Sequence, residues 1–154
     1  MKPLLEVSDV CLSYHSISGE TRVLSHISFS LFPGEFLAVV GPSGCGKSTL
    51  LNLICGLLKP EQGQILLNEE PVFAGDCRIG YMLQKDHLLE WRKIYKNVIL
   101  GLEIRKELTA EKLAYVNQML LTYGLDKFRN AYPSQLSGGM RQRAALIRTL
   151  ALSP

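Results

Sequence analysis

The first third of the chain alternates apolar and polar positions with the two-residue period of a half-buried strand. Apolar Ile27, Phe29 and Leu31 are separated by serines, and Pro33-Gly34 then supplies turn residues. The pattern predicts antiparallel sheet from Thr21 to Phe32.

A second apolar segment, Phe36-Leu37-Ala38-Val39-Val40, has no polar interruption and ends at a glycine. Strands that are covered on both faces in a parallel α/β sheet show such continuous runs, so we expect a central strand here. Two shorter strands are predicted at Gln64–Leu67 and Ile79–Leu83, with turn residues Asn68 and Gly75-Asp76 between them.

Leucine and isoleucine side chains between Leu50 and Leu58 would cover nearly the whole circumference of a helix. A helix that is apolar on every side belongs in a protein interior. We therefore expect a buried helix here, with Gly56 and Pro60 at its end.

The pattern becomes helical after about Ile94. Thr109 is the expected N-cap of a helix that closes near Gly124, a residue suited to the position after a helix end. A final helix is predicted from Gly139 to Leu152, with an apolar stripe formed by Met140, Ala144, Ile147 and Ala151.

Composition places the chain among folded domains, since 47% of its 154 residues are apolar and 20% are charged. The net charge of +3 is too small to predict a nucleic-acid partner. No apolar segment approaches the ~20 residues of a membrane span, so we expect no transmembrane helix. Glu6 and Asp9 follow Lys2 before any apolar segment develops, so we do not expect export. The cysteines show no metal-site or redox spacing, which favours reduced thiols in a cytosolic protein: Cys11, Cys45, Cys55 and Cys77. The histidines show no ligand spacing either: His15, His26 and His87.

A phosphate-binding pattern lies between the apolar segment and the buried helix. Gly41-Pro42-Ser43-Gly44-Cys45-Gly46-Lys47-Ser48 fits G-x-x-x-x-G-K-[ST]. The glycines let backbone N–H groups surround phosphate oxygens, Lys47 would bind the β- and γ-phosphates, and Ser48 offers a hydroxyl oxygen to Mg²⁺. A plain glycine turn is the alternative, but a strand before and a helix after favour nucleotide binding.

A second pattern, Leu136-Ser137-Gly138-Gly139-Met140-Arg141-Gln142-Arg143, reads physically as a capped helix start with exposed amides, which is an anion site. An ordinary capped surface helix would show much of this too. Together with the upstream phosphate loop, the pattern resembles the signature sequence of ABC (ATP-binding cassette) ATPases.

The resemblance implies an α/β P-loop NTPase of the ABC ATPase type, with an N-terminal antiparallel β-subdomain and a helical subdomain. We expect a β-subdomain and P-loop core at 1–93, a helical subdomain at 94–138 and a signature helix at 139–154. The family continues into an Asp-Glu strand, a D-loop and a switch histidine, so the resemblance also implies that 1–154 is incomplete at the C-terminus. On its own it is then expected to fold poorly and to hydrolyse little ATP.

The resemblance also assigns individual residues. Gln84 would reach Mg²⁺ and the attacking water, although a glutamine at a strand end is often only structural. Tyr14 would stack on adenine, or simply pack at a sheet edge. Trp91 and Arg92 would contact a permease, or pack on the helical region. The expected ATP-binding residues are Tyr14, Gly41, Pro42, Ser43, Gly44, Cys45, Gly46, Lys47, Ser48, Thr49 and Gln84, with Ser137, Gly138 and Gly139 acting on the nucleotide of a second subunit.

For the longer parent protein, the resemblance implies an ATP-hydrolysing subunit of an importer for nitrate, sulfonate, taurine or a related small solute. Its cofactors would be ATP and Mg²⁺. It would form a head-to-tail dimer, bind a transmembrane permease on the cytoplasmic face of the membrane, and serve a periplasmic or extracellular solute-binding protein indirectly. The alternatives are a soluble ABC ATPase for DNA repair or translation, and a P-loop kinase or GTPase with a chance signature.

Overall fold

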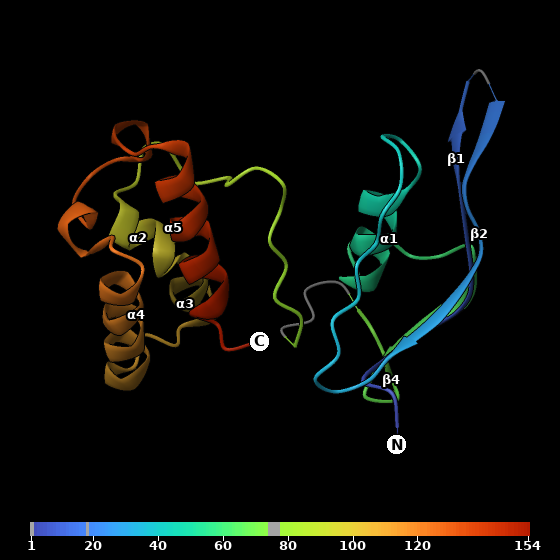
Figure 1. The fold of residues 1–154 in the computed structure, drawn as a ribbon, viewed down its shortest axis with the longest axis horizontal. Coiled ribbons are helices and arrows are strands. Elements are labelled where there is room, and N and C mark those ends of the chain that lie inside the picture. Colours follow the sequence, from blue (N-terminus) through green and yellow to red (C-terminus); the bar gives the residue numbers. More distant parts are fainter. Residues whose placement is uncertain (1, 18, 74–77) are drawn as a thin grey trace. The chain divides into compact units, whose positions relative to one another are not determined.

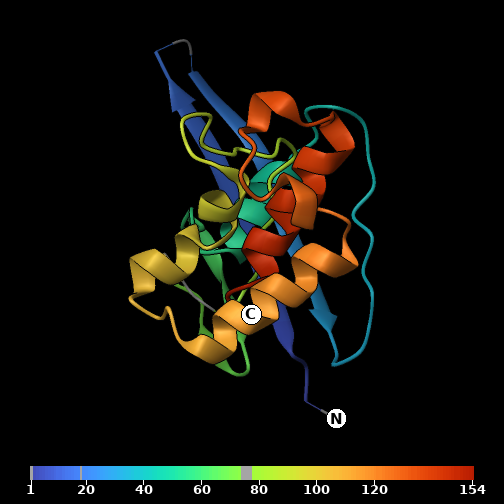
Figure 2. The same ribbon diagram turned by 90° about the vertical axis from the view of Figure 1, so that its left-hand side faces the viewer.

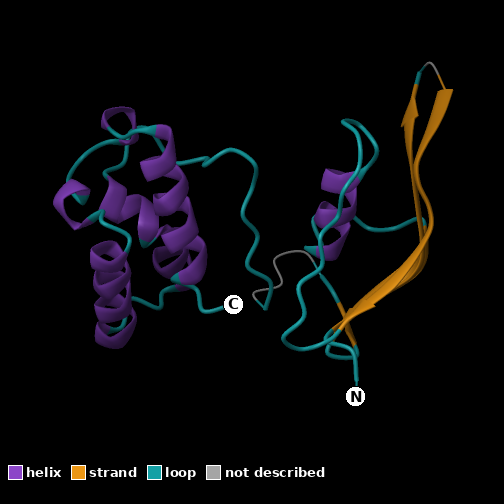
Figure 3. Ribbon diagram, in the orientation of Figure 1, coloured by secondary structure: helices purple, strands orange, loops and turns teal. Residues whose placement is uncertain are grey.

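The computed structural model describes residues 2–17, 19–73 and 78–154. The chain divides into two compact units, Met1–Asp76 and Cys77–Pro154. The first unit contains the strands, and the second contains a cluster of helices (Figure 1 and Figure 3). The subdomain boundaries expected after residues 93 and 138 stay predictions.

The first unit is built on a four-stranded antiparallel sheet with the order β2-β1-β3-β4. Its strands are β1 (Leu5–Ser16), β2 (Gly19–Leu31), β3 (Gln62–Leu67) and β4 (Glu70–Pro71). β1 pairs with both β2 and β3, so the predicted strands at 21–32 and 64–67 are confirmed.

The turn predicted at Asn68 is also confirmed. Asn68 and Glu69 have φ angles of 51° and 67° and connect β3 to β4 as a two-residue hairpin loop. The other predicted turn, Gly75-Asp76, lies outside the described residues.

Helix α1 (Lys47–Ile54) supplies buried leucines to the first unit, whose core also draws on the sheet. The buried apolar residues of this unit are Leu5, Val7, Val10, Cys11, Leu12, Leu24, Leu50, Leu53, Ile65 and Leu67. Burial of α1 is one-sided, because Leu50 and Leu53 are buried while Leu51 is exposed. The expectation of a helix over 50–58 that is buried all round is therefore wrong: α1 ends at Ile54, and Leu57, beyond it, is exposed.

The strand predicted at residues 36–40 does not form. Phe36 is 94% exposed and Val40 is 86% exposed. A central parallel strand requires hydrogen-bonded neighbours on both edges, and no strand among the described residues pairs with this segment. The strand predicted at Ile79–Leu83 is absent for the same reason, and Met82 and Leu83 are exposed.

The second unit is helical, as predicted for the chain after Ile94. Its α-helices are α2 (Ile94–Val98), α3 (Leu100–Arg105), α4 (Ala110–Thr122) and α5 (Gly138–Leu150), with 3-10 turns η1 (Asp126–Phe128) and η2 (Pro133–Gln135). Helix α5 lies against α2, α3 and α4 (Figure 2). Among the described residues, no helix has both the length and the apolar character that a membrane span requires.

The helix ends follow the predicted capping chemistry. The Thr109 hydroxyl accepts a hydrogen bond from the Lys112 N–H (3.3 Å), and Gly124 has a φ of 69° just past the end of α4. Of the predicted stripe on α5, Met140 is partly buried, and the other three members are fully buried in the helical core: Ala144, Ile147 and Ala151.

Candidate nucleotide-binding site

The loop from Gly41 to Ser48 is shaped by glycines in backbone conformations that other residues rarely adopt. Gly44 and Gly46 have φ angles of 83° and 96°. Gly46 is the N-cap of α1 and is buried, and a Cβ there would lie 3.0 Å from Leu24 Cδ2 and 3.1 Å from the Val23 carbonyl oxygen. Both dihedral angle and space therefore require glycine at position 46.

The start of α1 leaves backbone N–H groups available to a ligand. No side chain caps this helix, and the Leu50 N–H bonds to the Gly46 carbonyl at 2.8 Å. The amides of residues 47–49 precede that bond and so have no partner within the helix. Such amides, together with the helix dipole, favour phosphate at this end of α1.

The ammonium group of Lys47 bends back over the loop. Its Nζ donates hydrogen bonds to the carbonyl oxygens of Gly41 (2.8 Å) and Pro42 (2.6 Å) and lies 3.6 Å from Cys45 Sγ. The loop thus holds a positive charge over its own carbonyls, beside the anion-binding amides.

Tyr14 stands at the end of β1 and reaches the helix that follows the loop. Its Oη lies 3.4 Å from Thr49 Oγ1, and the side chain is 47% exposed, which leaves much of it open to a ligand. Ser48, one residue earlier, is exposed and offers the hard oxygen that Mg²⁺ prefers. Among the described residues no cluster of three His, Cys, Asp or Glu side chains could hold a metal.

Sequence reasoning missed the side chain that holds the strand end carrying Tyr14. Glu61 accepts a hydrogen bond from the Ser13 N–H (2.9 Å) with one carboxylate oxygen and contacts His15 Nε2 (3.0 Å) with the other. The hydrogen bond with His15 is the main cause that lowers the pKa of Glu61. No local pattern marks this contact, because 46 positions separate the two partners.

In the second unit, Gln84 and the start of α5 line one open groove. The Gln84 carbonyl accepts a hydrogen bond from Gln142 Nε2 (3.3 Å). Ser137 caps α5, because its hydroxyl accepts from the Met140 N–H at 3.4 Å. Gly138 and Gly139 are exposed at that helix start. Gln84 and the signature-like start of α5 therefore lie on one surface of this unit.

Two arginines of α5 secure the loop after Gln84. Arg141 Nε lies 3.1 Å from Asp86 Oδ2, and Arg148 donates to the carbonyl oxygens of Asp86 (2.7 Å) and His87 (2.8 Å). Burial lowers the pKa of Arg148, but its ordinary value is so high that the group stays charged. The seven-residue spacing of these arginines on one helix face was the only sequence signal for this role.

Comparison with known proteins shows which family this chain belongs to. A family model described as "ABC transporter" matches residues 24–154. The chain belongs to the ABC transporter family. An uncharacterized ABC transporter ATP-binding protein of Bacillus subtilis, YtlC, is 45% identical over 97% of this chain, and the taurine import ATP-binding protein TauB of Pseudomonas aeruginosa is 39% identical over 97%. This chain spans 58% and 57% of their respective lengths.

Solved structures of the ABC transporter family confirm the predicted fold class. A dimeric structure of the ATP-binding cassette MJ0796, in a post-hydrolysis state with ADP and Pi, matches with a TM-score of 0.84 and 29% identity. The match covers 97% of this chain and 70% of that one. The chain therefore has the fold of part of an ABC cassette, including its antiparallel sheet and its helical cluster.

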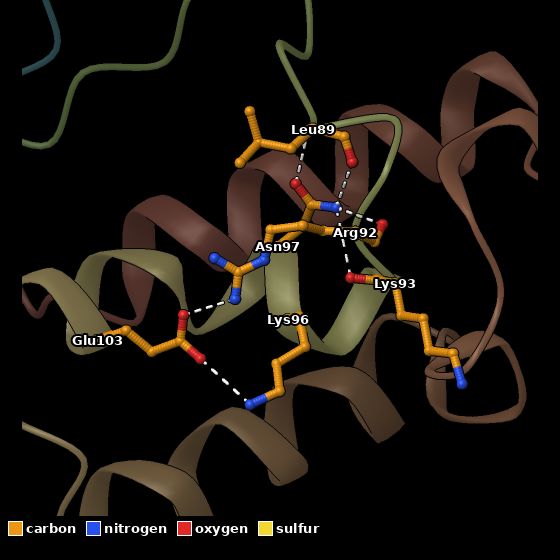
Figure 4. Close-up of polar contacts among 6 residues, drawn as sticks. All are labelled: Leu89, Arg92, Lys93, Lys96, Asn97 and Glu103. Carbon is orange, nitrogen blue, oxygen red and sulfur yellow. Dashed lines mark hydrogen bonds and ion pairs between the residues drawn. The ribbon is translucent and has the colours of Figure 1, made fainter.

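The two residues predicted to face a permease of an ABC transporter have different surroundings. Trp91 is 75% exposed. Arg92 is largely buried, and its Nη2 lies 2.5 Å from Glu103 Oε2 (Figure 4). The hydrogen bond from Arg92 is the first cause that lowers the pKa of Glu103. Only Trp91 of this pair presents a free side chain.

Proposed function

We propose that the natural protein containing this chain binds and hydrolyses ATP to power an ABC importer. The observation that carries the proposal is the Gly41–Ser48 loop, where left-handed Gly44 and Gly46 lead into the uncapped start of α1 under the Lys47 ammonium. This arrangement favours a polyphosphate over other anions, because the amides and the cation are spread along one loop.

Each residue of the site has a role in this proposal. Lys47 exchanges its bonds to the Gly41 and Pro42 carbonyls for bonds to the β- and γ-phosphates. Tyr14 would stack on adenine, and the Ser48 hydroxyl oxygen would hold Mg²⁺. Gln84 would be a further ligand for that ion and would orient the attacking water. A bound Mg²⁺ would neutralise charge on the phosphate oxygens.

The start of α5 acts on the nucleotide of a second subunit. Gly138 and Gly139 are exposed, and Ser137 already uses its hydroxyl as a helix cap. We expect these residues to bind the γ-phosphate held by Lys47 of the partner in a head-to-tail dimer, a geometry with twofold symmetry. The dimeric state of the MJ0796 cassette supports this arrangement.

The second partner is a transmembrane permease, contacted through Trp91 on the cytoplasmic face of the membrane. TauB is a taurine import protein, which supports taurine or a related small solute such as a sulfonate or nitrate, delivered by a solute-binding protein. A soluble ABC ATPase without a transport role is the alternative. Co-purification with a polytopic membrane protein that is lost in Trp91→Ala supports the importer, and retention without such a partner supports the alternative.

Calorimetry with Mg-ATP tests the nucleotide site. Lys47→Ala removes the ammonium group that would bond the β- and γ-phosphates, so ATP affinity should fall about 100-fold or more. Lys59→Ala, which removes an exposed lysine beyond α1, is the matched control and should bind as the wild type does. Undiminished affinity in Lys47→Ala would refute the assignment of the loop.

A further inference from the structure

Trp91 lies at the tip of a tight turn. The Arg92 N–H donates to the Leu89 carbonyl at 3.0 Å, which makes Glu90 and Trp91 the two central residues. With three-quarters of its surface open to solvent, the indole of Trp91 is available to a partner protein. Tryptophan is one of the side chains that most often dominate binding energy at interfaces.

The buried side-chain amide of Asn97 is hydrogen-bonded to the backbone of this turn. Asn97 on α2 has no exposed surface, and its Oδ1 accepts a hydrogen bond from the Leu89 N–H at 2.7 Å. Its Nδ2 lies within donor distance of three carbonyl oxygens, those of Leu89 (3.0 Å), Arg92 (2.9 Å) and Lys93 (3.3 Å). Figure 4 shows the side chain directed into the bend of the turn. One side chain therefore contacts both ends of the turn.

A second brace comes from α3. Glu103 lies between two cations, with Arg92 Nη2 at 2.5 Å and Lys96 Nζ at 3.2 Å (Figure 4). This pairing draws the Arg92 side chain from the turn toward α3. The turn is thus fixed by backbone contacts to Asn97 and by the Arg92 side chain, while Trp91 stays free.

We infer that Asn97 is a positioning residue for the partner contact, and that Arg92 is part of the brace and not of the contact surface. The inference rests on the proposed permease contact of Trp91. The partner surface that suits this turn is a cytoplasmic permease segment with an apolar recess for one indole ring. Holding the turn in shape before binding removes the entropy cost of ordering it in the complex.

Asn97→Asp is the test variant, because it keeps the size and one acceptor but replaces the donor that faces three carbonyls. The matched control is Asn130→Asp, the same change at an exposed position of the same unit. The first readout is the fluorescence anisotropy decay of Trp91, the only tryptophan of the 154 residues. Any tryptophan outside them is replaced by phenylalanine.

We expect the amplitude of nanosecond motion at Trp91 to rise at least roughly twofold in Asn97→Asp and to stay unchanged in Asn130→Asp. The helix signal in circular dichroism, measured alongside, reports whether the helices of the protein are retained as a whole. Unchanged motion at Trp91 in Asn97→Asp, with this signal retained, would overturn the positioning role whatever the protein's function. If the helix signal falls in this variant, the measurement is repeated with Asn97→Ser, which keeps a small polar group.

The second readout is the ratio of the ATPase rate with the co-purified permease to the rate without it. Loss of the buried hydrogen bonds should lower this ratio about tenfold in Asn97→Asp. A loosened turn with an unchanged ratio would also overturn the inference. Failure of the proposed permease contact is recognised separately, because Trp91→Ala would then leave the ratio unchanged.

Discussion

The apolar segment at residues 36–40 of the first unit and the helical core of the second unit differ sharply in burial. In the first unit, residues 36–40 are all apolar, yet they form no strand and Phe36 and Val40 are almost fully exposed. In the second unit, an apolar set from several helices is fully buried: Ile94, Val98, Leu102, Val116, Leu120, Leu125 and Ile147. Helices satisfy their own backbone and need only side-chain partners, whereas a strand needs hydrogen-bonded neighbours.

The contrast has a consequence for the nucleotide site. The Gly41–Ser48 loop keeps its left-handed glycines and leads into α1 although the segment before it has no strand partner. Local dihedral preferences therefore shape the loop, while long-range packing shapes the helical unit.

Removal of a fully buried side chain should distinguish the two units most strongly. Leu102→Ala leaves a cavity in the helical core and should lower the free energy of unfolding by about 2–5 kcal/mol, as measured by urea denaturation. Val40→Ala shortens an exposed side chain and should change it by less than about 0.5 kcal/mol. Equal costs would show that residues 36–40 are packed as well as the helical core.

Ser137→Arg should separate nucleotide binding from subunit pairing. The change removes the hydroxyl that caps α5 and puts a bulky side chain where the partner's nucleotide would bind, so nucleotide-driven dimerisation of the natural protein should weaken roughly 100-fold. Binding of ATP by one subunit should persist, because the Gly41–Ser48 loop lies in the other unit. Light scattering with and without Mg-ATP measures the dimer, and intact dimers in this variant would contradict the role of Ser137 in the partner's site.

Two cysteines of the first unit should differ in alkylation, measured in a Cys77→Ser background. Cys45 is exposed in the loop, whereas burial raises the pKa of the Cys55 thiol and so lowers its thiolate fraction. Cys45 should therefore react first at neutral pH. Saturating Mg-ATP should slow Cys45 about tenfold and leave Cys55 unaffected. Equal rates for Cys45 with and without nucleotide would place the ligand elsewhere.

The smallest expected effect concerns the brace in the second unit. Hydrogen bonding by Arg92 lowers the pKa of Glu103, so this carboxylate stabilises the fold above its unfolded pKa of about 4.3, and the contribution is lost as the pH falls through the lower folded value. Wild type and Glu103→Gln should differ by less than about 1 kcal/mol near neutral pH, and the difference should vanish in acid. Thermal unfolding across this range measures it, and Arg92→Gln should remove most of the pH dependence. A difference that grows in acid would reverse the assigned sign.

Sequence reasoning succeeded where the signal spans a few residues. The caps Thr109 and Ser137 and the stripe on α5 all depend on contacts within about one helical turn. It was wrong for the strands at 36–40 and 79–83, because composition records that a segment is apolar but not whether a neighbouring strand is there to pair with it.

The amino-acid sequence alone indicated the family, through its two glycine-rich motifs, and located the caps Thr109 and Ser137, because a cap depends on residues within one helical turn. Only the folded chain shows which polar side chains meet. His15 contacts Glu61 across 46 positions, Arg92 contacts Glu103, and the Asn97 amide bonds to the backbone of the turn that carries Trp91. Of these groups the Asn97 amide is fully buried, and a polar atom removed from water must find a partner in the folded chain.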